Sequence, residues 1–168
     1  MIFGAITNSW RQQLESQELM DLVGQAERVG ARHIELRQTC LGQCEDGSGE
    51  GWRPNLDRLA DLIDAHPDLT FDLAMAWPCL TQIIDPRGEG FQAALAGAKL
   101  VGKARPHLRV VDPSPFDAPW ESPEDIPAEA LGIEALATEA ARQGVVMSIE
   151  NSGQPIRSLA MLVKVARV

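Results

Sequence analysis

Residues 144–151, GVVMSIEN, form a short apolar run that begins after a glycine and ends in a carboxylate and an amide. Four similar runs precede it at near-regular intervals and start near Ile2, His33, Thr70 and His107. A stretch with helical periodicity follows each of the five runs. Strands that alternate with amphipathic helices are typical of βαβ units, so the sequence predicts a parallel sheet covered by helices.

Capping residues and prolines set the expected element boundaries. Ser16 and Gly30 bound the first helix, and Asn55 and Pro67 bound the second. The later strands are expected at 33–37, 70–77, 108–112 and 145–150, and the later helices at about 91–101, at 128–143 and from Pro155 onward. The predicted buried stripes of the first three helices are Leu19, Leu22, Val23, Ala26 and Val29; Leu56, Leu59, Ala60 and Ile63; and Phe91, Ala94, Leu95, Ala98 and Val101.

Two architectures are built from such units: a doubly wound sheet, which five strands can complete, and a barrel of eight units. Three features favour an incomplete (β/α)8 TIM barrel with about five βα units and parallel strands. The crossovers are uniform in length, no Gly-rich turn follows the first strand, and the apolar pattern of the last helix continues to Val168 without a capping Gly or Pro. We therefore expect residues 1–168 to form a single domain, the N-terminal part of a longer barrel.

The fifth strand of such a segment would expose the backbone donors and acceptors along one of its edges. We expect this edge to pair with the remainder of a longer protein or with another copy of the chain, which would make a homo-oligomer.

Composition narrows the class of protein. The chain has 45% apolar and 23% charged residues, which is typical of a globular domain, and its net charge of −9 argues against nucleic acid or an anionic membrane as a partner. No apolar run approaches the ~20 residues that cross a bilayer. Three cysteines, an odd number, and a start without a basic leader indicate free thiols in a reducing compartment, so we expect a cytoplasmic protein.

Four segments together resemble the xylose isomerase-like TIM barrels: GARHIELR (30–37), FDLAMAWP (71–78), LRVVDPSP (108–115) and GVVMSIEN (144–151). This superfamily includes sugar-phosphate isomerases and epimerases, hydroxypyruvate isomerase-like proteins, inosose dehydratases and endonuclease IV. The resemblance covers essentially the whole chain.

The resemblance implies a divalent metal (Mn, Mg, Zn or Co) at the C-terminal mouth of the full-length barrel, with Glu150 matching the ligand that closes the fifth strand. The other ligands of the family come from strands six to eight, so this chain alone need hold no metal. Trp77 and Asp112 stand where many relatives carry histidines, which counts against an endonuclease IV-like activity.

Glu150 is the first candidate for chemistry. Alternation along the fifth strand predicts Val146, Ser148 and Glu150 on one face and Met147 and Ile149 on the other, which would aim the carboxylate into the barrel. In sugar isomerisation such a group can bind metal and exchange a proton beside a carbonyl. The alternative is a solvated strand-end residue that caps the following helix.

Glu35 and Arg37 share a face of the second strand, because they are two residues apart. Arg37 is predicted to hold an anionic or polyol substrate, with Glu35 orienting it. A structural ion pair between the two in the barrel core is the equal alternative.

Four more substrate-binding candidates follow strands: Asn8, Trp10, Trp77 and Asp112. A Trp can stack on a sugar and Asn8 can bond a hydroxyl, but for each Trp the alternative, ordinary loop packing, is favoured. For Asp112 the alternative to substrate contact, a cap on the next turn, is favoured.

Other polar residues indicate structural roles. His33, His66 and His107 fall at the end of the barrel associated with stability. Cys40 and Cys44 have no second Cys or His pair at zinc spacing, and the glycine-rich residues 47–51 predict a mobile loop or lid.

The sequence thus predicts a sugar or sugar-phosphate isomerase or epimerase that transfers a proton next to a carbonyl with the help of a metal. One alternative is a catalytically incomplete barrel segment that serves as a binding or assembly module. An endonuclease IV-like repair enzyme is the least favoured.

Overall fold

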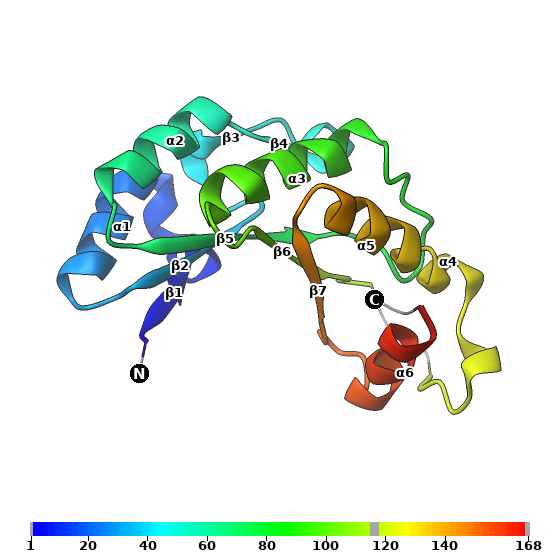
Figure 1. Ribbon diagram of the computed structural model, residues 1–168. Coiled ribbons are helices and arrows are strands. Elements are labelled where there is room, and N and C mark those ends of the chain that lie inside the picture. Colours follow the sequence, from blue (N-terminus) through cyan, green and yellow to red (C-terminus); the bar gives the residue numbers. More distant parts are fainter. Residues whose placement is uncertain (1, 115–117, 167–168) are drawn as a thin grey trace.

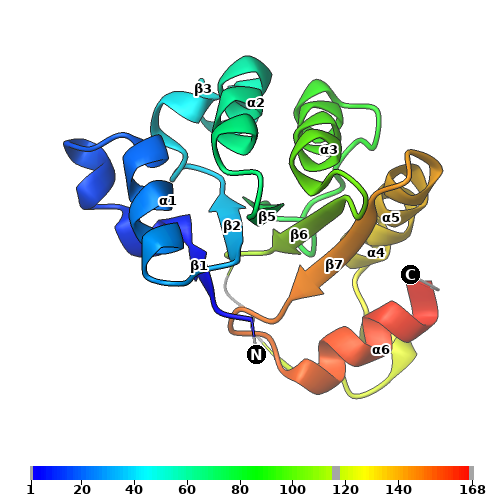
Figure 2. The same cartoon turned by 60° about the vertical axis from the view of Figure 1, so that its left-hand side comes forward.

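A computed structural model describes residues 2–114 and 118–166 as a curved parallel sheet with helices along its outer side (Figure 1; Figure 2). The sheet order is β1-β2-β5-β6-β7, and each neighbouring pair is parallel. Its strands are β1 (Gly4–Ile6), β2 (His33–Arg37), β5 (Thr70–Ala76), β6 (His107–Val111) and β7 (Val146–Glu150). Strands that neighbour each other in chain order, without a reversal, match the expected partial TIM barrel and exclude a doubly wound sheet.

The helices connect the strands on the outer side of the sheet (Figure 2). They are α1 (Leu19–Arg28), α2 (Leu56–Ala65), α3 (Glu89–Gly102), α4 (Ala128–Leu131), α5 (Ile133–Arg142) and α6 (Ile156–Ala166). None of the helices in the described part of the chain is long and apolar enough to span a membrane. Val168, on which the expected continuation of the last helix partly rested, lies outside the described residues.

The expectation of a single helix at 128–143 is wrong. The N–H of Gly132 donates to the carbonyl of Glu129 (3.1 Å), and the N–H of Ala135 donates to the carbonyl of Gly132 (3.1 Å). These bonds span three residues instead of four, so the α-helical ladder is interrupted and α4 and α5 are separate.

The hydrophobic core lies between the outer face of the sheet and the helices. Alternate strand residues such as Ile34, Leu36, Leu73 and Leu108 are fully buried there. The predicted stripe of α3 is buried throughout. Two predicted core residues are wrong: Leu56 is exposed in the first turn of α2, and Val29 is 88% exposed because α1 ends at Arg28.

The loop after β2 is folded, which corrects the expectation of a mobile lid. It carries the two-stranded hairpin of β3 (Glu45–Asp46) and β4 (Arg53–Pro54). The carboxylate of Glu45 accepts hydrogen bonds from the N–H groups of Thr39 (2.8 Å) and Leu41 (3.0 Å) and from the indole of Trp52 (2.6 Å). Trp52 itself is buried, so the loop has its own piece of core. Cys40 and Cys44 are free and buried beside it, as expected of unpaired thiols.

Candidate functional site

The face of the sheet opposite to the helices, called here the inner face, carries a line of charged side chains. Register fixes their positions: Arg37 of β2, Ala74 of β5 and Arg109 of β6 are partners across the sheet, and Arg109 is also the partner of Ser148 on β7. Because partners on parallel strands point to the same side, one row of side chains crosses the inner face near the C-terminal ends of the strands. TIM barrels place their sites at this end.

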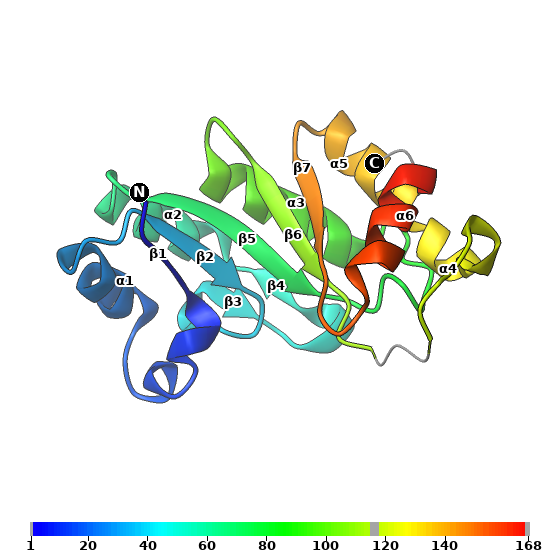
Figure 3. The ribbon, with the colours of Figure 1, turned by 90° about the horizontal axis from the view of Figure 1, so that it is seen from below.

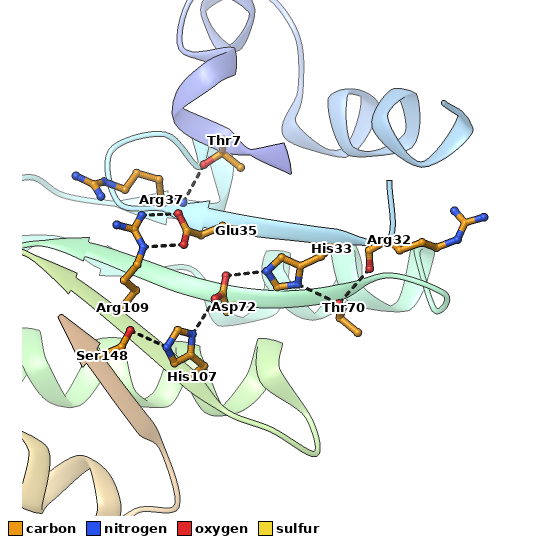
Figure 4. Close-up of polar contacts among 10 residues, drawn as sticks. All are labelled: Thr7, Arg32, His33, Glu35, Arg37, Thr70, Asp72, His107, Arg109 and Ser148. Carbon is orange, nitrogen blue, oxygen red and sulfur yellow. Dashed lines mark hydrogen bonds and ion pairs between the residues drawn. The ribbon is translucent and has the colours of Figure 1, made fainter. Parts of the chain in front are cut away.

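Arg109 joins two carboxylates across this row. Its Nε donates to Glu35 Oε2 (2.7 Å), its Nη2 contacts Glu35 Oε1, and its Nη1 contacts Glu150 Oε2 (Figure 4 shows Glu35 and Arg109). Glu35 lies on β2 and Arg109 on β6, so the arginine reaches over the intervening β5, where Ala74 offers only a methyl group. The fork of a guanidinium matches this bidentate geometry.

Burial differs between the two carboxylates. The side chains of Arg109 and Glu35 are 15% and 17% exposed, whereas that of Glu150 is 42% exposed. Among the three linked side chains Glu35, Arg109 and Glu150, Glu35 therefore lies at the buried end and Glu150 at the solvent-facing end. The structure places Glu150 on the inner face with Ser148, as strand alternation predicts, and against Arg109.

Glu35 neither orients Arg37 nor forms the alternative ion pair with it, because both oxygens of Glu35 are engaged by Arg109. The backbone N–H of Arg37 donates to Thr7 Oγ1 (2.8 Å). Burial lowers the pKa of the Arg37 guanidinium, and the positive charge of Arg109 lowers it further.

Sequence reasoning missed Arg109 as a site residue. Its signal was the same two-residue alternation that selected Glu150, since His107 and Arg109 are polar and alternate with the buried Leu108 and Val110 on β6.

A second polar cluster lies on the inner face at the N-terminal ends of the strands (Figure 4). Asp72 Oδ2 is 2.8 Å from His107 Nδ1, and Asp72 Oδ1 is 3.3 Å from His33 Nε2. His107 Nε2 lies 2.8 Å from Ser148 Oγ. Asp72 on β5 thus links β2, β6 and β7.

The two polar neighbours of His33, Thr70 and Asp72, favour its protonated form. The Thr70 hydroxyl donates to the carbonyl of Arg32 (3.0 Å), so it can only accept from His33 Nδ1 (3.0 Å). His33 Nε2 faces the Asp72 carboxylate, so both ring nitrogens have an acceptor for a proton. The hydrogen bond to Asp72 accordingly raises the pKa of His33. Burial alone would raise the pKa of Asp72, but hydrogen bonds with His107 and His33 outweigh it and lower the pKa to about 2.

This cluster predicts a pH window of greatest stability. The lowered pKa of Asp72 contributes stability above about pH 4, and this contribution is lost as the pH falls towards 2. The raised pKa of His33 contributes stability below about pH 6.5, and this contribution is lost as the pH rises through the pKa of His33 in the folded state. We expect the urea midpoint to be highest between these limits, with about 2 kcal/mol from Asp72. In Asp72→Asn the urea midpoint should fall less than in the wild type as the pH is lowered from about 4 towards 2. If the urea midpoint of this variant falls with acid as steeply as that of the wild type, the stabilising role of ionised Asp72 is contradicted.

Asp112, a predicted substrate contact or turn cap, is fully buried after β6. Its carboxylate accepts hydrogen bonds from the N–H groups of Leu80 (2.6 Å) and Ser114 (2.8 Å), and its carbonyl accepts one from Gln154 Nε2 (3.2 Å). These bonds tie together the loops after β5, β6 and β7. The position of the Asp112 side chain fits the predicted role of a turn cap.

The remaining candidates lie at the ends of β1 and β5, as expected. The ring of Trp77 packs on Phe91 of α3 with centroids 5.7 Å apart, and the half-buried Trp10 packs against the hydrophobic core. Both contacts fit the loop-packing alternative. Asn8 is exposed. Their roles towards a substrate stay predictions.

A metal centre needs several ligands, and Glu150 is the one that the family resemblance places in this chain. Within residues 2–114 and 118–166, no three His, Cys, Asp or Glu side chains are grouped so that they could hold a metal ion. Arg109 also occupies one side of the Glu150 carboxylate. The described residues therefore do not form a metal centre by themselves.

No protein-family model and no curated protein matches the sequence. Solved structures do match it in fold. The IolI protein with a bound zinc atom is 18% identical, with a TM-score of 0.67 over 100% of this chain and 60% of that one. D-allulose 3-epimerase from Methylomonas sp., in complex with D-allulose, is 14% identical, with a TM-score of 0.64 over 99% and 59%.

A xylose isomerase domain protein from Alicyclobacillus acidocaldarius is 13% identical, with a TM-score of 0.60 over 100% of this chain and 60% of that one. This chain thus spans about three fifths of the length of each of these proteins. At these identities the likeness concerns the fold. The chain has the fold of an incomplete (β/α)8 TIM barrel, made of five consecutive βα units and similar to part of each of these structures.

Proposed function

We propose that this chain provides one wall of the site of a sugar or sugar-phosphate isomerase or epimerase, with Glu150 as the residue that exchanges the proton. The observation that carries the proposal is the half-exposed carboxylate of Glu150 at the C-terminal edge of the inner face, held by Arg109. The fold supports it, because one protein of the same fold was solved with D-allulose and another with zinc.

The proposed chemistry is proton transfer at a carbon next to a carbonyl. Glu150 would take the proton from that carbon and return it to the adjacent former carbonyl carbon, while a hydroxyl proton moves to the former carbonyl oxygen, which gives the isomer. Epimerisation would also need a second acid that delivers a proton to the opposite face of the first carbon. Arg109 would fix the direction of the Glu150 carboxylate, and Glu35 would hold Arg109 from the buried side. Metal binding by Glu150 belongs to the same proposal and would require ligands beyond the described residues.

Solvent exchange tests this function on the chain itself. The protein is incubated in heavy water with D-fructose, D-allulose or their phosphates, with and without Mn²⁺, and the loss of the carbon-bound proton beside the carbonyl is followed by NMR. We expect loss above the protein-free rate for at least one sugar. Binding without exchange would instead support the alternative, a catalytically incomplete binding module.

An assembly role remains the second proposal, and the edge of β7 favours it. Val146 N donates to the carbonyl of Pro106 beside β6 (2.9 Å), so the N–H groups of residues 147 and 149 point to the other side, where no strand of the described residues pairs with them. Pairing with another copy through this edge would make a homo-oligomer.

A further inference from the structure

The end of β2 holds Arg37 in a fixed position. Its backbone N–H donates to the buried Thr7 (2.8 Å), and its carbonyl accepts from Cys40 N (2.9 Å). The turn between these residues contains Thr39 with a φ of 64°, a conformation that a non-glycine residue adopts only when its surroundings impose it. The N–H of Thr39 is fixed in turn by the Glu45 carboxylate (2.8 Å).

The guanidinium of Arg37 has no hydrogen-bond or ion-pair partner among residues 2–114 and 118–166. It points away from Glu35 and from the Asp72 cluster (Figure 4). Glu35 cannot serve it, since both of its oxygens bind Arg109. Its neighbour across the sheet is Ala74, whose side chain leaves the inner face beside Arg37 uncrowded.

Arg37 is also partly removed from water, and burial of an unpaired charge is costly. The charges of Arg109 and Arg11 act on it as well. On the inner face the charge of Arg109 is matched by the carboxylates of Glu35 and Glu150, whereas no carboxylate among the described residues pairs with Arg37.

A planar guanidinium that is half-buried, unpaired among the described residues and carried by a fixed backbone suits an oxyanion, because two of its N–H groups can bond two oxygens of a phosphate or carboxylate together. We propose that Arg37 binds the anionic group of the substrate, so that the substrate class is a sugar phosphate or sugar acid and not a neutral sugar. The sugar part of this inference rests on the proposed function, whereas the binding of an oxyanion does not.

Inorganic phosphate is the direct probe. Titration into the folded chain, followed by NMR shifts of the backbone amides of residues 37–40, is expected to show saturable binding that Arg37→Gln weakens by about tenfold or more and Arg37→Lys weakens less. Arg32→Gln is the matched control: it removes the same charge at the opposite end of β2, where the guanidinium donates to the carbonyl of Ala31 (2.8 Å), and it should leave phosphate binding unchanged.

Three results would overturn the inference: no saturable phosphate binding by the wild-type chain, equal binding by Arg37→Gln, or an equal loss in Arg32→Gln. Thermal unfolding of each variant verifies that it is folded, and Arg37→Lys supplies a second variant if Arg37→Gln is not.

A second comparison separates this inference from the proposed function. The wild type should bind D-fructose 6-phosphate more tightly than D-fructose. The Arg37→Gln variant should bind the two sugars equally tightly. This result would support the oxyanion site even if no sugar exchanged a proton. Proton exchange of neutral sugars alone, without tighter binding of the sugar phosphate, would support the proposed function and reject the oxyanion site.

Discussion

Glu150→Gln is expected to slow solvent exchange at the substrate carbon by about 100-fold or more, because an amide cannot take up the proton and general acid–base catalysis contributes about 10²–10⁴. The glutamine keeps the shape of the side chain, so substrate binding should change much less than the exchange rate. The assay is the heavy-water exchange described above, with the sugar that the wild type processes fastest.

The control for this variant is Glu89→Gln, which removes an exposed carboxylate that pairs with Arg53 on the outer side of the sheet. It should exchange at the wild-type rate. If Glu150→Gln also retains that rate, Glu150 is not the residue that moves the proton. Glu150→Asp should keep part of the activity, since the carboxylate remains but is set back from the substrate.

Arg109→Met is expected to cost about 3 kcal/mol of unfolding free energy, because it leaves Glu35 as an unpaired carboxylate in a largely buried position. Glu150 adds little to this loss, since water reaches it. Urea unfolding at pH 6 measures the effect. Adding Glu35→Gln to Arg109→Met should recover part of the loss, because the stranded charge is then gone.

The matched control is Arg157→Met, which breaks an arginine–carboxylate pair with Glu121 whose two side chains are both largely exposed. Its urea midpoint should stay close to that of the wild type. An Arg109→Met midpoint equal to that of this control would show that the Glu35–Arg109 pair does not contribute to the stability of the inner face.

Strand alternation explains how much of the site could be predicted from the sequence. Because side chains alternate with a period of two, Glu35, Arg37 and Glu150 could be assigned to one face from their neighbours alone, and the structure places them there. The partner of Glu35 could not be found in this way. Arg109 lies 74 residues later and reaches Glu35 across β5, which depends on the register of three strands and on the small side chain of Ala74.

Two other differences between expectation and structure have local causes. The loop after β2 has the composition of a flexible segment, but Glu45 collects three hydrogen bonds and Trp52 supplies a buried ring, and neither effect follows from composition. The break between α4 and α5 depends on a turn at Gly132, a residue that an amphipathic pattern can pass through.

The central claim is that ligands bind to the inner face of the sheet at the C-terminal ends of its strands. Mapping of backbone amide shifts during titration with D-fructose 6-phosphate tests it most directly. We predict that the shifts cluster at Arg37, Trp77, Val111 and Glu150, the residues at or directly after the ends of β2, β5, β6 and β7 (Figure 3). Shifts confined to the outer helices, or at the His33 and His107 ends of the strands, would contradict it.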